Sequence, residues 1–275
     1  MKLYWFIANI FQGLFTACWT AFWISCALVM LVLTLNPDVP LAMARRFWGP
    51  GLLWGARAKL AIEPLPNVDW SQPHIFISNH QSMIDICAAF VAIPVNIRFV
   101  AKQVLKYVPF LGWYMWATGM IFVDRSNRER AVRSLALAGE RIRGGANILA
   151  YPEGTRSRDG RILPFKKGPF VVALRAGVPI IPVAIEGAGR VLPADGFGVR
   201  PGTIRVKFGE PIPTAGLTDD QRDQLMRQVR DAIIDLTASI GGPGGDKATA
   251  IAKVGREGEA EDAKPKSKAL EKTGS

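Results

Sequence analysis

The chain has few of the side chains that build metal sites and disulfide frameworks. Among 275 residues there are two histidines and three cysteines, and the cysteines show no Cys-x-x-Cys spacing. An odd number of separated cysteines in apolar surroundings argues against a disulfide framework and against a zinc site. With only two histidines, a histidine-based metal centre is also disfavoured, so the sequence predicts no metal ion.

Charge is missing from the first part of the chain, since no charged residue occurs between Leu3 and Pro37. This run exceeds the roughly 20 residues that span a bilayer core and the roughly 7–15 apolar residues of a signal peptide. We therefore predict a retained hydrophobic membrane helix or hairpin over residues 1–38. Residues 39–64 mix arginines with Trp and Phe, which is typical of an interfacial amphipathic helix. Whether the first segment crosses the bilayer or lies in one leaflet stays open.

Acidic residues are scarce in one central block. Residues 98–175 carry 15 Lys or Arg but only 5 Asp or Glu, which accounts for most of the net charge of +11. A diffuse excess of basic residues would indicate little beyond solubility. A local excess predicts an anionic partner, which can be a phosphate group, a nucleic acid or an acidic membrane surface.

After the Pro-Leu-Pro sequence at 64–66, short apolar runs alternate with helical patterns. Strands are predicted at 74–78, 96–100, 120–123, 147–151, 180–185 and 203–208. This alternation predicts an α/β fold with a mostly parallel or mixed sheet flanked by helices, preceded by N-terminal membrane helices. We assign this domain to residues 65–240. Residues 241–275 are rich in Gly, Ala and Lys without aromatic residues, which predicts a disordered tail without an assigned function.

One of the two histidines, His80, lies five residues before Asp85 in the sequence Asn-His-Gln-Ser-Met-Ile-Asp. Histidine is the default general base near neutral pH. Five helical steps of about 100° separate two side chains by about 140°, so a pairing requires His80 on a turn and Asp85 early in a helix. Ser78 and Gln81 have the capping-box spacing that starts a helix. On spacing alone, a capping or surface pair is the commoner explanation of such a motif.

Two further stretches follow predicted strands, where α/β proteins usually bind ligands. The strand at 120–123 ends in Asp124-Arg125, and the strand at 147–151 runs into Pro-Glu-Gly-Thr-Arg. In the second stretch, Gly154 allows close backbone approach and Arg156 offers a planar fork that matches phosphate oxygens. The alternatives are an ion pair at a strand end and a solvated basic loop.

Together these stretches resemble the glycerolipid acyltransferases, specifically the bacterial 1-acyl-sn-glycerol-3-phosphate acyltransferases. The resemblance covers about residues 65–215 and includes Ala101-Lys102, Pro109–Trp113 and Val178–Val183. It implies that His80 is the base and that Asp85 orients it. It further implies substrate binding by Lys102, Arg125, Glu153, Gly154, Thr155 and Arg156, and a hydrophobic or acyl-donor wall that includes Pro179. Tyr151 stands where the family commonly has Phe, and Gln103 stands where it often has an acid.

The resemblance implies acyl transfer from acyl-CoA or acyl-carrier protein to the sn-2 hydroxyl of lysophosphatidate, which gives phosphatidate without a metal or bound cofactor. The implied partners are these substrates and membrane lipids, with no nucleic acid. The implied location is the bacterial inner membrane, with the catalytic domain on the cytoplasmic side because acyl donors are cytosolic.

Three alternatives are weighed against this function. The acceptor could instead be glycerol 3-phosphate or a lyso-aminolipid, although the dense basic residues favour a phosphate-bearing acceptor. A lipid hydrolase is disfavoured because the chain has no Gly-x-Ser-x-Gly elbow. A membrane-tethered nucleic-acid-binding module explains the basic block but has no use for His80 or Glu153, and stacking aromatic residues are not interleaved with these charges.

Overall fold

The computed structural model describes residues 2–124 and 128–245, and their central element is a seven-stranded sheet in the order β1-β7-β6-β2-β5-β3-β4. All neighbouring strands are parallel except β6 and β7, which pair antiparallel. The strands are β1 (Ala58–Ile62), β2 (Ile75–Ser78), β3 (Ile97–Lys102), β4 (Ile121–Val123), β5 (Asn147–Ala150), β6 (Ile180–Glu186) and β7 (Gly202–Phe208).

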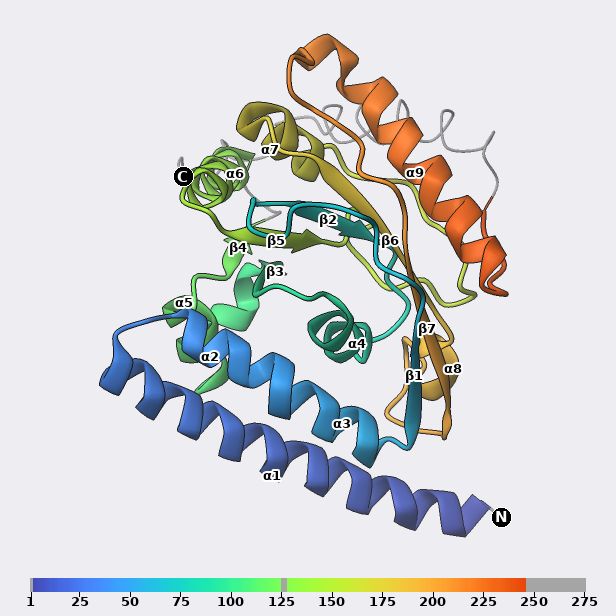
Figure 1. Cartoon of the computed structure of the whole chain (residues 1–275). Helices are drawn as coiled ribbons and strands as arrows, with labels where there is room; N and C mark the ends of the chain where they lie inside the picture. Colours follow the sequence, from blue (N-terminus) through green and yellow to red (C-terminus); the bar gives the residue numbers. More distant parts are fainter. Residues whose placement is uncertain (1, 125–127, 246–275) are drawn as a thin grey trace, which may run out of the picture. The chain divides into compact units, whose positions relative to one another are not determined.

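Helices cover both faces of this sheet (Figure 1). The α-helices are α1 (Lys2–Thr34), α2 (Asp38–Met43), α3 (Gly49–Gly55), α4 (Asp85–Ala92), α5 (Leu111–Ala117), α6 (Arg128–Arg143), α7 (Gly168–Ala176), α8 (Ala188–Val191) and α9 (Arg222–Ser239). A π-helix, η1 (Ala44–Trp48), joins α2 to α3, and two 3-10 helices are η2 (Gln103–Tyr107) and η3 (Asp219–Gln221).

The alternation of side chains along β2 explains the two hydrophobic layers. Successive residues of a strand point to opposite faces of the sheet. Phe76 accordingly packs in the layer of α3 and α4, whereas Ile75 and Ile77 pack in the layer of α6, α7 and α9. Every residue of β2, β5 and β6 is buried, as expected for strands in a sheet that helices cover on both sides.

All six predicted strands are confirmed to within two residues at each end, and the predicted α/β class is confirmed. A capping box formed by Thr218 and Gln221 begins η3. The helix predicted over 39–64 is shorter than expected. Helical structure ends at Gly55, Arg57 takes the left-handed φ of 51°, and β1 pairs in parallel with β7 at the edge of the sheet.

The long helix α1 runs beside α2 and α3 (Figure 1) and packs against them. Two glycines one turn apart in α3 make this packing close, because a Cβ on Gly51 would collide with Trp19 and one on Gly55 with Phe15. Small residues at this spacing let two helix backbones approach. The Trp19 indole N–H also donates to the carbonyl of Trp48 at 3.1 Å.

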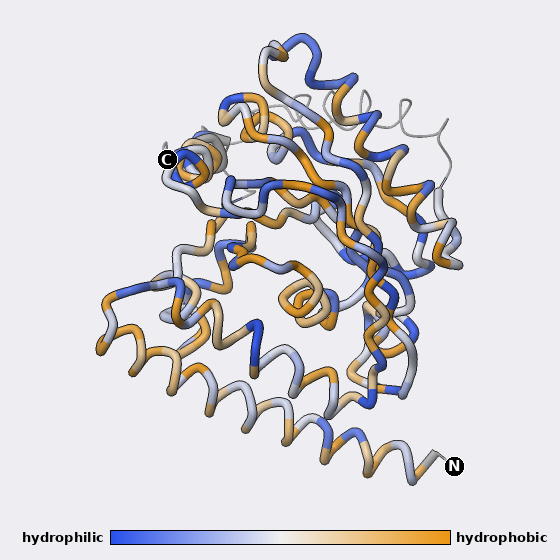
Figure 2. The backbone as a smooth tube through the Cα atoms, in the orientation of Figure 1, coloured by the Kyte–Doolittle hydropathy of each residue, from blue (hydrophilic) through white to orange (hydrophobic). Residues whose placement is uncertain are grey.

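From Leu3 to Thr34, α1 is long and apolar enough to cross a membrane, and only 11% of its most apolar window is buried. The C-terminal half of this helix is coloured predominantly hydrophobic in Figure 2. The compact unit runs to Gly245, and the carbonyl of Gly244 accepts a hydrogen bond from the N–H of Ile162. The remainder of the predicted tail, residues 246–275, lies outside the described residues.

Candidate functional site

The carboxyl ends of four parallel strands meet at one edge of the sheet, where most of the predicted site residues lie. His80 follows β2, the loop with Glu153 and Arg156 follows β5, Lys102 ends β3 and Asp124 follows β4. These strands are neighbours in the order β2-β5-β3-β4. Arg125, the next predicted residue after β4, lies outside the described residues.

His80 and Asp85 form a hydrogen-bonded pair at this edge. The Nδ1 of His80 lies 2.8 Å from Oδ2 of Asp85, and the Asp85 side chain is completely buried whereas His80 keeps 14% of its side-chain surface exposed. No hydrogen bond involves Nε2 of His80 within the described ranges. Because the carboxylate holds Nδ1, the Nε2 atom is the one that can take a proton from a ligand.

The position of Asp85 at the first turn of α4 agrees with the sequence prediction, but the predicted cap between Ser78 and Gln81 is wrong. Ser78 donates instead to the carbonyl of Asn79. The Oδ2 atom of Asp85 accepts the backbone N–H groups of Gln81 at 2.7 Å and Ser82 at 2.8 Å. These N–H groups precede α4, whose own start has no side-chain cap, so the carboxylate that orients His80 also organises the turn before the helix.

Asn79 fixes the other side of His80, a role that the sequence analysis missed. Its side chain donates to the carbonyl of Ile185 and accepts from the N–H of Ile185, both at 2.8 Å. The buried amide thus continues the β2–β6 hydrogen-bond ladder by one more step. A polar amide shortly after the apolar run Ile75–Ile77 was the available signal.

Glu153 is buried, with 4% of its surface exposed, and it braces the His80 backbone. Oε1 accepts the N–H of His80 at 3.0 Å, and Oε2 accepts the N–H of Leu163 at 3.2 Å. Burial raises the pKa of Glu153 to about 8, and the N–H groups of His80 and Leu163 offset this only in part. The same loop also holds His80 through Ser157, whose N–H donates to the His80 carbonyl at 2.7 Å.

Two further side chains, those of Tyr151 and Cys87, lie close to the His80–Asp85 pair. The ring of Tyr151 stacks on His80 with centroids 4.2 Å apart, a contact that sequence reasoning did not anticipate. Burial raises the pKa of the Tyr151 hydroxyl well above its ordinary value. Burial also raises the pKa of the Cys87 thiol to about 12, with Asp85 adding to the effect. A thiol in this state is a poor nucleophile at neutral pH.

The remaining predicted residues of the loop after β5 lie nearer the surface. Gly154 has the left-handed φ of 72° that its turn requires, Thr155 is exposed and Arg156 is half-buried. No ion pair or side-chain hydrogen bond engages the Arg156 guanidinium in the part of the chain that the structure describes. Lys102 is exposed at the end of β3 and pairs in register with Val123 of β4.

Pro179 does not join this group. It directly precedes β6, and its carbonyl accepts the N–H of Ile75 at the start of β2. Because β2 and β6 run parallel with Ile75 opposite Ile180, Pro179 lies at the amino edge of the sheet. At about 3.3 Å per residue, the length of β2 and its turn separates this edge from His80.

Within residues 2–124 and 128–245, no three His, Cys, Asp or Glu side chains gather in a way that could hold a metal ion. The described groups at this edge are a buried carboxylate, an oriented imidazole and nearby cationic side chains.

Comparison with protein families gives a match to acyltransferases over residues 59–186. A Saccharomyces cerevisiae protein named 1-acyl-sn-glycerol-3-phosphate acyltransferase is 38% identical over 174 residues, which span 62% of this chain and 57% of that protein. The human 1-acyl-sn-glycerol-3-phosphate acyltransferase beta is 36% identical over 149 residues, which span 54% of each chain. The chain thus spans about half the length of the curated relatives it matches.

Among solved structures, the 1-acyl-sn-glycerophosphate acyltransferase PlsC from Thermotoga maritima is similar with a TM-score of 0.74 and 26% sequence identity. The match covers 86% of this chain and 97% of that chain. It therefore extends well beyond the segment that the family match covers.

Proposed function

Because the chain belongs to the 1-acyl-sn-glycerol-3-phosphate acyltransferase family, we propose that it transfers an acyl chain from a thioester donor to the sn-2 hydroxyl of lysophosphatidate. The donor is acyl-CoA or acyl-carrier protein, and the product is phosphatidate. The observation that carries this proposal is the His80–Asp85 pair, whose Nε2 atom is left to take the hydroxyl proton.

In the proposed reaction, Nε2 of His80 removes the proton of the acceptor hydroxyl as its oxygen attacks the thioester carbonyl. The tetrahedral intermediate then collapses, the carbon–sulfur bond breaks and the leaving thiolate takes the proton from the imidazolium. Asp85 holds Nδ1 protonated and stabilises the positive charge that forms on the ring. Its complete burial strengthens this electrostatic interaction because water does not screen it.

The acceptor phosphate is proposed to bind at the same edge, with Arg156 as its bidentate partner and with Gly154, Thr155, Lys102 and Arg125 beside it. Arg156 supports this because its guanidinium is half-buried in the loop that also supports His80. Glu153 is proposed to position His80 rather than to contact the acceptor, since both of its carboxylate oxygens accept backbone N–H groups. Pro179 is proposed to contribute to a hydrophobic or acyl-donor wall, away from His80 at the amino edge of the sheet.

Direct transfer without an acyl-enzyme is part of the proposal. Cys87 is buried with a raised pKa, and the Ser82 hydroxyl donates to the carbonyl of Leu192 at 2.6 Å. Within the described residues, no hydrogen bond joins either side chain to His80, the proposed base.

We further propose that α1 lies in the membrane surface beneath the catalytic domain instead of crossing the bilayer. Contacts with the domain run along most of its length, from Asn9, which accepts the N–H of Val199, past Trp19 to the buried Ala27. A spanning orientation would pull the attached domain into the hydrocarbon. In the cell, the cytoplasmic side of a bacterial inner membrane supplies the acyl donors.

The test is acyl transfer by membranes that carry the protein, with lysophosphatidate, glycerol 3-phosphate or a lyso-aminolipid as acceptor and with each donor. We expect phosphatidate from lysophosphatidate, and its loss in His80→Ala. Transfer only to another acceptor would change the substrate and keep the mechanism. Unchanged transfer in His80→Ala would refute the role of His80.

A further inference from the structure

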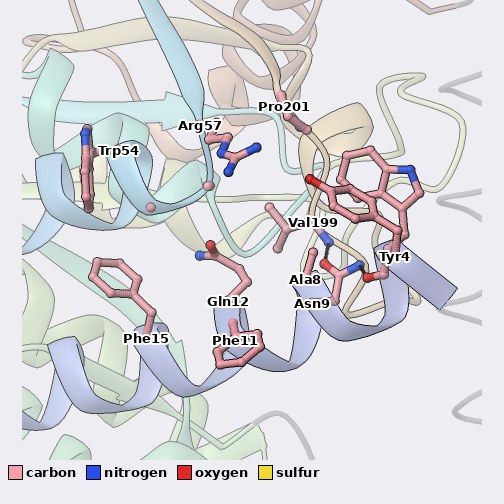
Figure 3. Close-up of a pocket in the computed structure, with 13 residues that line it drawn as sticks. Tyr4, Ala8, Asn9, Phe11, Gln12, Phe15, Trp54, Arg57, Val199 and Pro201 are labelled. Atoms are coloured by element: carbon pink, nitrogen blue, oxygen red, sulfur yellow. Dashed lines mark hydrogen bonds between the residues drawn. The ribbon is translucent and has the colours of Figure 1, made fainter. Parts of the chain in front are cut away.

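A pocket of about 540 Å³ lies between the first half of α1, the end of α3 and the loop at 199–201 (Figure 3). None of its lining residues has a proposed role in catalysis or acceptor binding, and none is acidic. Its volume lies within the range typical of ligand pockets. Aromatic rings from α1 and α3, including Phe11, Phe15 and Trp54, form much of its wall.

The pocket contains cationic groups in this largely apolar setting. Arg57 lines it, and its side chain and that of Gln12 both reach into the space between α1 and the chain that follows α3 (Figure 3). No ion pair or side-chain hydrogen bond engages the Arg57 guanidinium within residues 2–124 and 128–245. Arg200 lies beside the pocket, stacked over the Trp5 ring with its Cζ atom 4.2 Å from the ring centroid.

The backbone is arranged to keep this geometry. Arg57 has a left-handed φ of 51°, a conformation that is costly for a residue with a side chain. Asn9 links its own helix to the opposite wall, because its side chain donates to the carbonyl of Trp5 and accepts the N–H of Val199 at 2.7 Å. The two walls are thus tied together beside the cationic groups.

We propose that this pocket binds an anionic glycerophospholipid of the surrounding membrane, with its phosphate on Arg57 and Arg200 and an acyl chain along Phe11 and Phe15. A guanidinium pairs with phosphate oxygens through two parallel hydrogen bonds. The exposed apolar side chains of α1, such as Phe6 and Ile10, bring the pocket to the lipid phase. The bound lipid is a membrane component that the enzyme neither acylates nor releases, so this site goes beyond the proposed acyl transfer.

The experiment is native mass spectrometry of the full chain in a non-ionic detergent, titrated with phosphatidylglycerol or with diacylglycerol of the same acyl chains. We expect one phosphatidylglycerol to be retained and its affinity to fall about tenfold in Arg57→Gln, as expected for the loss of a charged hydrogen bond. Ala8→Phe should weaken it as well, because Ala8 lines the pocket. Arg46→Gln is the matched control, since Arg46 is exposed on η1 outside the pocket.

Equal retention of diacylglycerol, or unchanged phosphatidylglycerol affinity in Arg57→Gln, would overturn the proposal. An equal loss in Arg46→Gln would reduce the effect to general surface charge and would also overturn it. Competitive displacement by acyl-CoA would assign the pocket to the donor instead. Because the measurement requires no turnover, its failure is distinguishable from failure of the proposed acyl transfer, which the His80→Ala assay tests.

Discussion

Replacement of Glu153 by Gln separates two roles for this residue, positioning of His80 and binding of the acceptor. The Glu153 side chain accepts two backbone N–H groups, those of His80 and Leu163. Glutamine keeps one acceptor oxygen but turns an NH2 group toward the other N–H group. When Glu153 is ionised, above its pKa of about 8, a hydrogen bond to this charged group contributes about 1.5–3 kcal/mol. If loss of this hydrogen bond lets His80 leave its reactive position, the transition state is destabilised by this energy and kcat falls about 10- to 100-fold.

The assay is steady-state acyl transfer to lysophosphatidate with the purified full chain, at a pH above the Glu153 pKa of about 8. For Glu153→Gln we expect this fall in kcat, with a KM for lysophosphatidate within about twofold of wild type. The KM stays near its wild-type value because Glu153 is proposed to make no contact with lysophosphatidate. Arg156→Gln, in the same loop, is expected to raise the KM for lysophosphatidate and to leave kcat nearly unchanged. A raised KM at unchanged kcat in Glu153→Gln would refute the positioning role and would favour contact with the acceptor.

Three further outcomes are expected. Asp85→Asn removes the charge that stabilises the His80 imidazolium and should lower kcat about 100- to 1000-fold; a change below tenfold in steady-state assays would contradict this. Ser82→Ala should leave kcat unchanged but lower the free energy of unfolding by about 0.5–1.5 kcal/mol in denaturant titrations, because the partly buried Leu192 carbonyl loses its donor. Burial raises the pKa of Glu153 from 4.5 to about 8, so the stability that protonated Glu153 contributes is full below pH 4.5 and is lost as the pH rises toward 8. The difference in unfolding free energy between wild type and Glu153→Gln should therefore change between these pH values. A difference that does not depend on pH would be inconsistent with the raised pKa.

Local patterns predicted the features that depend on near neighbours in the chain. The apolar runs identified six strands, and the spacing of His80 and Asp85 required a turn followed by a helix, as found. Strand β1 escaped prediction because its pairing partner is β7, which includes Ile204, far along the chain. A short amphipathic run such as Ala58–Ile62 is ambiguous until that partner is known.

Contacts between separate loops were beyond local patterns. Tyr151 and Glu153 reach His80 only because β5 lies beside β2, and no spacing in the sequence encodes that neighbourhood. The cap predicted at Ser78 failed for a different, local reason, since the Asp85 carboxylate accepts the N–H groups of the turn. The position of Pro179, by contrast, could have been predicted from the direction of the strands. A residue that precedes a parallel strand lies at the edge of the sheet opposite to a residue that follows one.

The close packing of α1 on Gly51 and Gly55 has a practical consequence for the handling of this protein. Ile24 and Ala27 of α1 belong to the same hydrophobic cluster as Ile84 and Cys87, which flank Asp85 in the sequence. A fragment trimmed of its first helix would expose part of this cluster, which also includes residues of α4, the helix that begins at Asp85. We therefore expect that such a truncation yields an aggregating or inactive product instead of a soluble enzyme, and that extraction in detergent of the untrimmed chain preserves the site.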